Sequence, residues 1–266
     1  MGNHGKASLN SLGDSTISPF FGLERYGEAV KLSRMIRLYV DEDFEPGKNL
    51  RLPKSEQHYF KSVRRGKSDE ILEVFNRKGQ LARARFHERA LVILELIELE
   101  PAQHRLRLAV GLPDASVAKK VLAAASELGV EELIFFAAGR SQAAKKRLQK
   151  INDWGRYSIE SARQCGRSQP LKITSLSLNQ VLELCVKNRF VLDEVASNQG
   201  LFMDLSNPTD FLLLVGPEGG WTAEERAKIS EAGFRSLHFP TPILKVETAC
   251  VAACVWALMP SLLLGP

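Results

Sequence analysis

Hydrophobic and polar positions follow two different patterns along the chain, and one pattern replaces the other near residues 112–114. From Arg37 to about Leu108, short apolar runs bounded by turn residues predict β-strands. The expected strands are residues 35–40, 69–75, 80–86, 91–99 and 105–110. A hairpin turn is expected at residues 77–79, and a short helix ending in a basic cluster at residues 58–65. This part of the chain is therefore predicted to be rich in β-structure.

Beyond residue 114, apolar positions recur with helical spacing in some segments and form short continuous runs in others. The expected helices are residues 118–128, 149–165, 222–232 and 248–259. The expected strands are residues 133–137, 190–193, 212–215 and 236–239. Strands that alternate with helices are typical of a parallel sheet covered by helices, so this part is predicted to be an α/β fold.

One stretch, residues 211–225, organises the second part of the chain. Its apolar run, Leu212–Val215, reads as a strand buried on both faces, and it ends abruptly at Gly216. Pro217 lacks a backbone N–H, and the glycines around it permit positive φ. The strand is therefore expected to end here in a tight turn.

After this turn, Thr222 and Glu225 form a capping box that starts a helix. A strand, a glycine turn and a helix start present ligands at the carboxyl edge of open α/β sheets. The turn lacks the lysine and the Ser/Thr of a phosphate-binding loop, and Glu218 would repel a phosphate. A neutral or cationic ligand fits better, although a turn that merely joins strand to helix has the same appearance.

The predicted helix over residues 248–259 is apolar nearly all round. Such a helix must be covered on every side, and a terminal helix is seldom covered by its own chain. We expect a homodimer with Val251, Val255 and Trp256 among the buried positions. The cysteines show no metal-ligand spacing, so no metal site is expected.

The hydrophobic fraction of 44% is ordinary for a soluble globular protein, and no apolar run approaches the ~20 residues that span a bilayer. Four cysteines without a visible signal peptide indicate reduced thiols in the cytoplasm. Residues 1–34 are polar and weakly patterned, and we expect them to form a disordered extension.

The net charge of +5 is concentrated in one segment. Residues 140–172 contain nine lysines and arginines against Asp153 and Glu160, a local net charge of +7. A solvated helix face normally mixes both signs, whereas this segment barely does. The imbalance favours binding to an RNA backbone.

Four motifs in this part are GPEGG at 216–220, PTPILKVETA at 240–249, SELGV at 126–130 and ARQCGRSQP at 162–170. In order and spacing they resemble the RsmE family of RNA methyltransferases, in the SPOUT superfamily. The resemblance implies S-adenosylmethionine as cofactor and N3 of a uridine in small-subunit (16S) ribosomal RNA as the methylated atom. It also implies a SPOUT-type parallel sheet with a trefoil knot over residues 111–266, and a PUA-like β-barrel that binds RNA over residues 35–110.

The resemblance also suggests site residues. Arg167, in the family pattern Gln-x-Gly-Arg, is the first catalytic candidate and Lys245 the fallback, since a cation would stabilise the anion left at N3. Cofactor contacts are expected from Leu192, Leu214, Val215, Gly216, Glu218, Gly219, Phe239, Pro240, Ile243, Leu244 and Thr248. RNA contacts are expected from Arg37, Tyr39, His58, Arg64, Arg65, Arg140, Lys145, Lys146 and Arg147. Arg167 paired to a helix carboxylate and Thr248 as a helix cap are the structural alternatives.

The chain departs from the family where the family reads L-G-x-R-I-L-R-x-E-T-A. Pro240 stands for the glycine, Pro242 for the first arginine and Lys245 for the second. The two prolines remove N–H donors from a loop expected to bind adenine. Three functions therefore stay open: an RNA methyltransferase, an RNA-binding protein of the same fold that has lost catalysis, and a nucleotide-dependent α/β enzyme, which Glu218 opposes.

Overall fold

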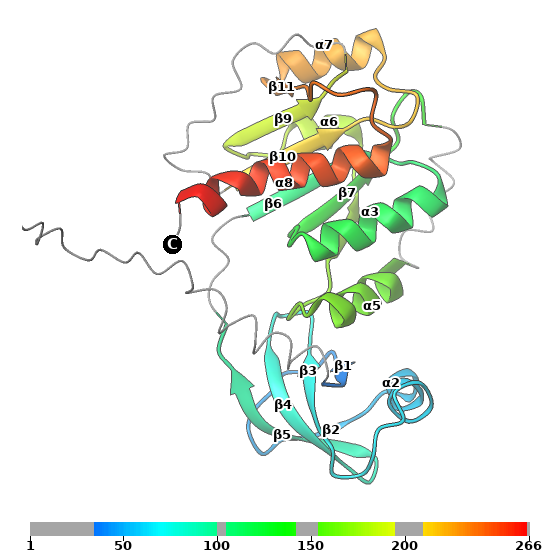
Figure 1. The fold of residues 1–266 in the computed structure, drawn as a ribbon, viewed down its shortest axis with the longest axis vertical. Helices are drawn as coiled ribbons and strands as arrows, with labels where there is room; N and C mark the ends of the chain where they lie inside the picture. Colours follow the sequence, from blue (N-terminus) through cyan, green and yellow to red (C-terminus); the bar gives the residue numbers. More distant parts are fainter. Residues whose placement is uncertain (1–34, 100–104, 142–153, 195–209, 265–266) are drawn as a thin grey trace, which may run out of the picture. The chain divides into compact units, whose positions relative to one another are not determined.

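The structure, a computed structural model, describes residues 35–99, 105–141, 154–194 and 210–264. From Ile36 onward the described residues belong to one compact unit, which contains two β-sheets (Figure 1). The expected disorder of residues 1–34 and the first part of the helix expected at 149–165 lie outside the described residues.

The first sheet has five strands in the order β1-β3-β4-β5-β2. They are β1 (Arg37–Tyr39), β2 (Asn49–Arg51), β3 (Ile71–Phe75), β4 (Leu81–His87) and β5 (Ala90–Ile97). β1 and β3 run parallel, whereas the other neighbours are antiparallel. In β4, Ala82, Ala84 and Phe86 are buried while Arg83 and Arg85 are exposed, the period-2 pattern on which the strand prediction was based.

The helix expected at residues 58–65 begins earlier in the chain. α2 spans Lys54–His58 and continues as a π-helical turn, η1, over Tyr59–Val63. Phe60 in this turn is fully buried, and its ring centroid lies 4.4 Å from that of Phe86. A Cβ at Gly66 would lie 2.1 Å from Cε2 of Phe60, so the chain can leave this turn here only with glycine.

The second sheet has six strands in the order β11-β9-β10-β6-β7-β8. They are β6 (Arg105–Gly111), β7 (Glu132–Phe136), β8 (Lys172–Ser175), β9 (Asn188–Leu192), β10 (Asp210–Val215) and β11 (Arg235–Leu237). Every neighbouring pair is parallel, which confirms the predicted α/β class. The helices are α3 (Ala115–Glu127), α5 (Gly155–Cys165), α6 (Leu178–Leu182), α7 (Ala223–Glu231) and α8 (Val246–Leu264).

Successive residues of β10 point to opposite faces of this sheet, which explains its continuous apolar run. Phe211, Leu213 and Val215 pack in one core cluster with side chains of α3 and α8. Leu212 and Leu214 pack in another with side chains of α6 and α7. All five side chains are buried, so the strand end that precedes the glycine turn is held from both sides.

α8 lies against the sheet beside α3 (Figure 1) and buries one of its sides there. The buried side contains Cys250, Ala253, Cys254 and Ala257. Burial raises the pKa of the Cys254 thiol to about 12, so this cysteine is a protonated core residue. In the part of the chain that the structure describes, no helix is both long enough and apolar enough to cross a membrane.

A buried ion pair joins α5 to the first part of the chain. Arg163 donates through Nη2 to both carboxylate oxygens of Glu56, at 2.7 and 2.9 Å. The Arg163 guanidinium also lies 4.0 Å from the centroid of the Tyr59 ring. Glu56 accepts a further hydrogen bond, at 3.1 Å, from the backbone N–H of Tyr39. The side chains of Arg163 and Glu56 are only 11% and 10% exposed.

Arg163→Ala is expected to lower the free energy of unfolding by about 3–5 kcal/mol, because it leaves the Glu56 carboxylate buried without its cation. Arg83→Ala is the matched control, since Arg83 pairs with Glu95 where both side chains are about half exposed. Exposed pairs contribute about 0.2–1 kcal/mol. Urea denaturation of both variants checks this, and equal losses would contradict it.

Candidate functional site

The turn after β10 rests on a buried tryptophan. Trp221 donates through Nε1 to the carbonyl of Leu192, at the end of β9, at 2.9 Å. A Cβ at Gly216 would lie 3.1 Å from Cε2 of this ring. Gly220 has a φ of +67°, and its N–H donates to the carbonyl of Pro217 at 2.9 Å. These contacts fix the turn to the neighbouring strand. They also explain why positions 216 and 220 are glycines.

The loop after β7 holds the same turn from another side. Glu225, part of the observed capping box with Thr222, accepts hydrogen bonds from the N–H groups of Thr222, at 2.9 Å, and Gly139, at 2.7 Å. Arg140 donates through Nη1 to the carbonyl of Gly219 at 2.9 Å. A Cβ at Gly219 would lie only 2.9 Å from Cβ of Arg140. The capping box therefore anchors a loop as well as starting α7.

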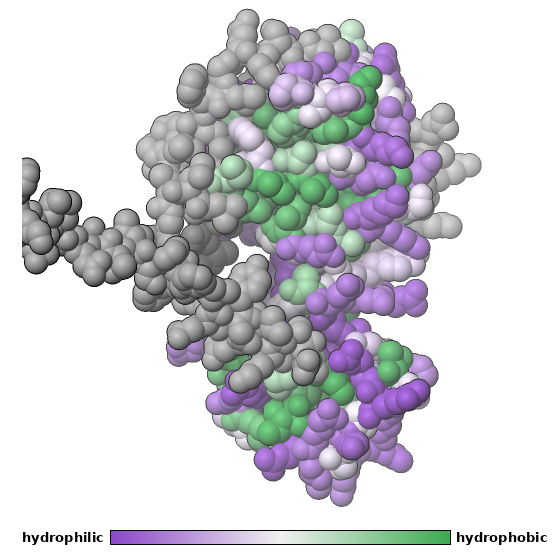
Figure 2. Space-filling view, viewed as in Figure 1, coloured by the Kyte–Doolittle hydropathy of each residue, from purple (hydrophilic) through white to green (hydrophobic). Residues whose placement is uncertain are grey.

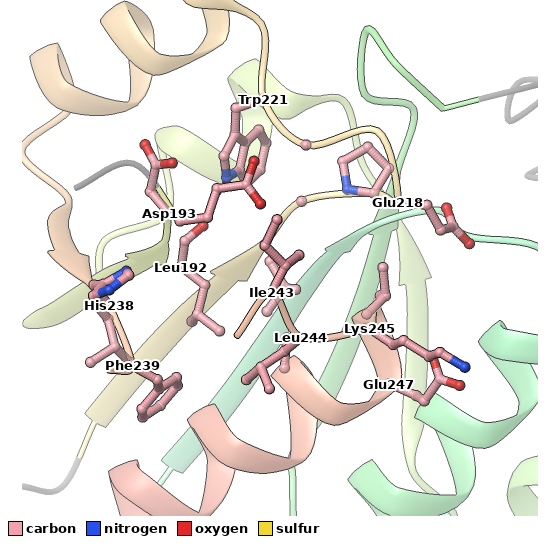
Figure 3. Close-up of a pocket in the computed structure, with 18 of the residues that line it drawn as sticks. Leu192, Asp193, Glu218, Trp221, His238, Phe239, Ile243, Leu244, Lys245 and Glu247 are labelled. Carbon is pink, nitrogen blue, oxygen red and sulfur yellow. The ribbon is translucent and has the colours of Figure 1, made fainter. Parts of the chain in front are cut away.

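A cavity of about 620 Å³ lies at the carboxyl edge of the second sheet, a size typical of small-molecule sites. Its walls come from the end of β9, the turn after β10, the segment from Leu237 to Ala249, and α3. Leu192, Phe239, Ile243 and Leu244 form its apolar part (Figure 3). Ile243 is 82% exposed, which places an apolar side chain at the opening.

Charged and polar side chains lie on two sides of this apolar part (Figure 3). Asp193 and His238 lie on one side, and Glu218, Lys245 and Glu247 on the other. Glu218 accepts a hydrogen bond at 3.1 Å from the backbone N–H of residue 114, at the start of α3. The pocket therefore presents charge at two ends and apolar surface between them.

Ion pairs orient the acidic groups of the pocket. Arg226 donates to both oxygens of Asp193, at 2.9 and 3.1 Å, and this hydrogen bonding raises the pKa of Arg226. Lys120 lies 3.2 Å from Glu247. The pKa of Glu247 is lowered first by a hydrogen bond from its own backbone N–H and then by Lys120 and Lys245. Within the described residues, no carboxylate lies within 4.0 Å of the Lys245 ammonium.

The arrangement suits a ligand with an uncharged planar part and a charged part. The apolar walls can enclose the planar part, and the charged side chains at the two ends can bind the charged part. A metal ion is not suggested by the described residues, where no three His, Cys, Asp or Glu side chains cluster as ligands.

Seven of the eleven residues expected at the cofactor line this cavity: Leu192, Val215, Gly216, Glu218, Phe239, Ile243 and Leu244. Leu214 does not, because it points to the other face of β10 and is fully buried there. Gly219, Pro240 and Thr248 are exposed and lie outside the lining.

Pro217, Gly220, Thr241 and Pro242 also line the cavity, and they belong to the turn and the loop that were expected to bind the cofactor. Further lining residues were not expected from the sequence: Val117, Lys120, Asp193, Glu194, Trp221, Arg226, Leu237, His238, Val246, Glu247 and Ala249. Asp193 is the last residue of a predicted strand and directly follows β9 in the structure, so its position at the carboxyl edge was a usable signal. Trp221 directly follows the glycine turn. Lys120 comes from a helix far away in sequence, and no local pattern points to it.

Arg167 does not line this pocket. Its Nη1 donates to the carbonyls of Ser126 and Val130, at 3.2 and 2.8 Å, where the chain leaves α3. Burial lowers the pKa of Arg167. These bonds go to backbone carbonyls rather than to the helix carboxylate considered above. In this position Arg167 stabilises the end of α3, and Lys245 is the candidate cation that lines the cavity.

Two residues expected to bind RNA are buried. Arg37 lies with Nε 2.9 Å from Oε2 of Glu73, and their side chains are 6% and 2% exposed. Desolvation lowers the pKa of Arg37 and raises that of Glu73. The hydroxyl of Tyr39 accepts a hydrogen bond from Nε of Arg77 at 2.8 Å. The sequence pattern did not show that Arg37 and Tyr39 form their polar contacts with other residues of the same chain.

The other expected RNA contacts divide into two groups. His58, Arg64 and Arg65 are exposed, and so is Arg140, although its guanidinium binds the carbonyl of Gly219. Lys145, Lys146 and Arg147 lie outside the described residues.

Comparison with known proteins extends over most of the chain. The family model described as "RNA methyltransferase domain" matches residues 100–258. The ribosomal RNA small subunit methyltransferase E of Buchnera aphidicola is 25% identical over 240 residues, which cover 85% of this chain and 93% of that protein. The protein of the same name from Aquifex aeolicus is 26% identical over 220 residues, covering 77% and 92% of the two chains.

Solved structures show the same fold. Lpg2936 from Legionella pneumophila, in complex with the bound cofactor SAM, matches with a TM-score of 0.75 and 25% identity, covering 85% of this chain and 98% of that chain. The ribosomal RNA small subunit methyltransferase E of Neisseria gonorrhoeae matches with a TM-score of 0.76 and 22% identity, covering 85% and 97%.

Proposed function

The chain belongs to the RNA methyltransferase domain family, and we propose that it methylates N3 of a uridine in 16S ribosomal RNA with S-adenosylmethionine as cofactor. The observation that carries this proposal is the cavity of about 620 Å³ bounded by the glycine turn after β10. The substrate, RNA of the small ribosomal subunit, is taken from the names of the relatives. A cytoplasmic location is proposed on the same basis.

The pocket fits this cofactor. Leu192, Phe239, Ile243 and Leu244 offer apolar walls to an adenine, and the carboxylates at the charged ends offer partners to the ammonium of the amino-acid part. Glu218 adds a negative charge that attracts a cation. S-adenosylmethionine supplies a methyl group activated by a positively charged sulfur.

The protein's own contribution is to position N3 and to stabilise the charge that develops there. N3 of uridine carries a proton in neutral RNA, and loss of this proton to water leaves an anion delocalised over the neighbouring carbonyls. N3 would then take the methyl group, and the cofactor's sulfur would keep the electrons of the broken bond. The Lys245 ammonium lines the cavity and can stabilise this anion. It is therefore the proposed catalytic cation, in preference to Arg167.

We also propose the finer fold features of the SPOUT family. The segment from Leu237 to Ala249 and the turn after β10 line one cavity, and a trefoil knot is proposed in this part of the chain. Known folds are almost never knotted, so this rests on family membership rather than on physical expectation. The five-stranded first sheet is proposed to be a PUA-like barrel that binds RNA, with His58, Arg64 and Arg65 on its exposed surface.

A second candidate function is RNA binding without catalysis. It is favoured by Pro242, which lines the pocket, and by Pro240 beside it, because neither offers an N–H to a cofactor.

Binding of labelled S-adenosylmethionine followed by transfer to unmodified small ribosomal subunits tests the proposal. Label in 16S ribosomal RNA is the expected result. Cofactor binding without transfer would favour the second candidate, and absence of cofactor binding would contradict both the pocket assignment and the activity.

We further propose a homodimer formed through α8. Its outer side exposes Val251, Val255 and Met259, which are 38%, 41% and 43% accessible and spaced four residues apart. This spacing puts the three apolar side chains on one side of the helix. An apolar stripe of this kind is suited to a subunit interface, and Figure 2 shows hydrophobic surface over the position of α8.

The double substitution Val251→Glu with Val255→Glu is expected to convert the dimer to monomers, because two charges would be buried in the interface. Ala227→Glu with Ser230→Glu, at exposed positions of α7, is the control and should remain dimeric. Sedimentation at micromolar concentration distinguishes the two. A wild-type monomer, or a dimeric Val251/Val255 variant, would contradict the assignment.

A further inference from the structure

Two positively charged side chains lie close to the ring of one tyrosine, on the surface where α3 and α5 pack together. The Nζ atom of Lys119, in α3, lies 4.5 Å from the centroid of the Tyr157 ring. The guanidinium carbon of Arg156, in α5, lies 5.6 Å from the same centroid. Tyr157 is half-buried and packs on the main core cluster, while Lys119 and Arg156 are exposed. We call these three residues the α3–α5 cluster.

The cluster carries positive charge that the surrounding described residues do not neutralise. Among them, no carboxylate forms an ion pair with Lys119 or Arg156, whereas the neighbouring Lys120 is paired with Glu247. Hydrogen bonds from Lys119 and then from Arg156 hold the pKa of the Tyr157 hydroxyl below its ordinary value. Two like charges held around one ring repel each other, and a bound anion would offset this repulsion.

The location of the cluster on α3 favours an RNA phosphate as the bound anion. Lys120 lines the cavity, and Lys119 precedes it on α3, with its side chain toward α5. The cluster therefore includes a residue of the helix that forms one wall of the proposed site of methyl transfer. An RNA whose target base enters that cavity brings further phosphates to the adjacent surface, because the backbone carries one negative charge per nucleotide.

We infer that Lys119, Arg156 and Tyr157 bind the phosphate backbone of the substrate RNA next to the target nucleotide. The inference rests on the proposed function and adds an RNA-binding surface on the α/β part of the chain. Lysine and arginine neutralise phosphate, and the tyrosine hydroxyl adds a hydrogen-bonding group. Such contacts position the RNA without reading its sequence.

The test uses a full-length double variant that carries both Lys119→Gln and Arg156→Gln. It is compared with a control variant that loses the same amount of positive charge. Lys187→Gln with Lys228→Gln is that control, since both lysines are exposed and neither lines the cavity. Binding to a 16S ribosomal RNA transcript is measured at several salt concentrations, and methyl transfer at several RNA concentrations. Thermal unfolding verifies that both variants are folded.

Loss of two phosphate contacts is expected to reduce the slope of log affinity against log salt by about 1.4–1.8, at about 0.7–0.9 per contact. KM for RNA should rise while kcat at saturating RNA stays unchanged, because these contacts hold ground state and transition state equally. A slope and a KM equal to those of the control would overturn the inference. Failure of the wild type to transfer methyl groups would instead overturn the proposed function, and the binding slopes would still decide the role of the cluster.

Discussion

Lys245→Ala is expected to reduce kcat for methyl transfer by about 10²–10³, the usual effect of removing one preorganised electrostatic group. Lys245 lines the pocket, and among the described residues no carboxylate lies within 4.0 Å of its ammonium, although its charge lowers the pKa of Glu247. Its charge is therefore available to the anion at N3 in the transition state. Cofactor affinity should change little, and Lys245→Arg should recover only part of the rate, because a planar guanidinium does not replace a compact ammonium.

Single-turnover rates at saturating RNA and cofactor make the measurement, and Arg167→Ala provides the comparison. Arg167 binds the carbonyls of Ser126 and Val130 and does not line the pocket. We expect Arg167→Ala to keep kcat but to destabilise the fold by about 1–3 kcal/mol, because two carbonyls lose their donor. The assignment would be overturned if the Arg167 variant lost its rate while the Lys245 variant kept it.

The second large effect is expected at the start of the glycine turn. Gly216 lines the pocket, and a side chain there would crowd Trp221, since a Cβ would lie 3.1 Å from the indole. Gly216→Val should force the turn and the indole apart. A displacement of about 1 Å at a reacting centre costs about 10²-fold, so methyl transfer should fall at least this far and cofactor binding should weaken with it.

Gly155→Val is the control for this substitution, because a Cβ at Gly155 meets nothing within 4 Å. Calorimetric titration of S-adenosylmethionine into both variants, with thermal unfolding to verify the fold, makes the comparison. A folded Gly216→Val protein with wild-type cofactor affinity would place the cofactor elsewhere.

Local rules were sufficient to predict the central part of this fold. The apolar run of β10, the glycine turn and the Thr222–Glu225 capping box each depend on a few neighbouring residues. All three are present in the structure. β2, β8 and α6 span only three to five residues each and left no periodic signal.

The site was less predictable because it depends on which face a residue occupies and on distant partners. Val215 lines the cavity and Leu214 does not, a difference of one residue in strand register. Arg37 is of a residue type that commonly contacts RNA, but it is buried and forms an ion pair with Glu73 on the neighbouring strand. Arg167 matches a family pattern, yet the carbonyls that bind it come from the end of another helix.

The identity of the methylated nucleoside tests the central claim most directly. The wild-type protein is incubated with S-adenosylmethionine and unmodified small ribosomal subunits, and the 16S ribosomal RNA is digested to nucleosides and resolved by chromatography and mass spectrometry. The account predicts 3-methyluridine, formed in a reaction that Lys245→Ala slows by about 10²–10³. A methyl group on a ribose hydroxyl or on another base, or no transfer by a protein that binds the cofactor, would contradict it.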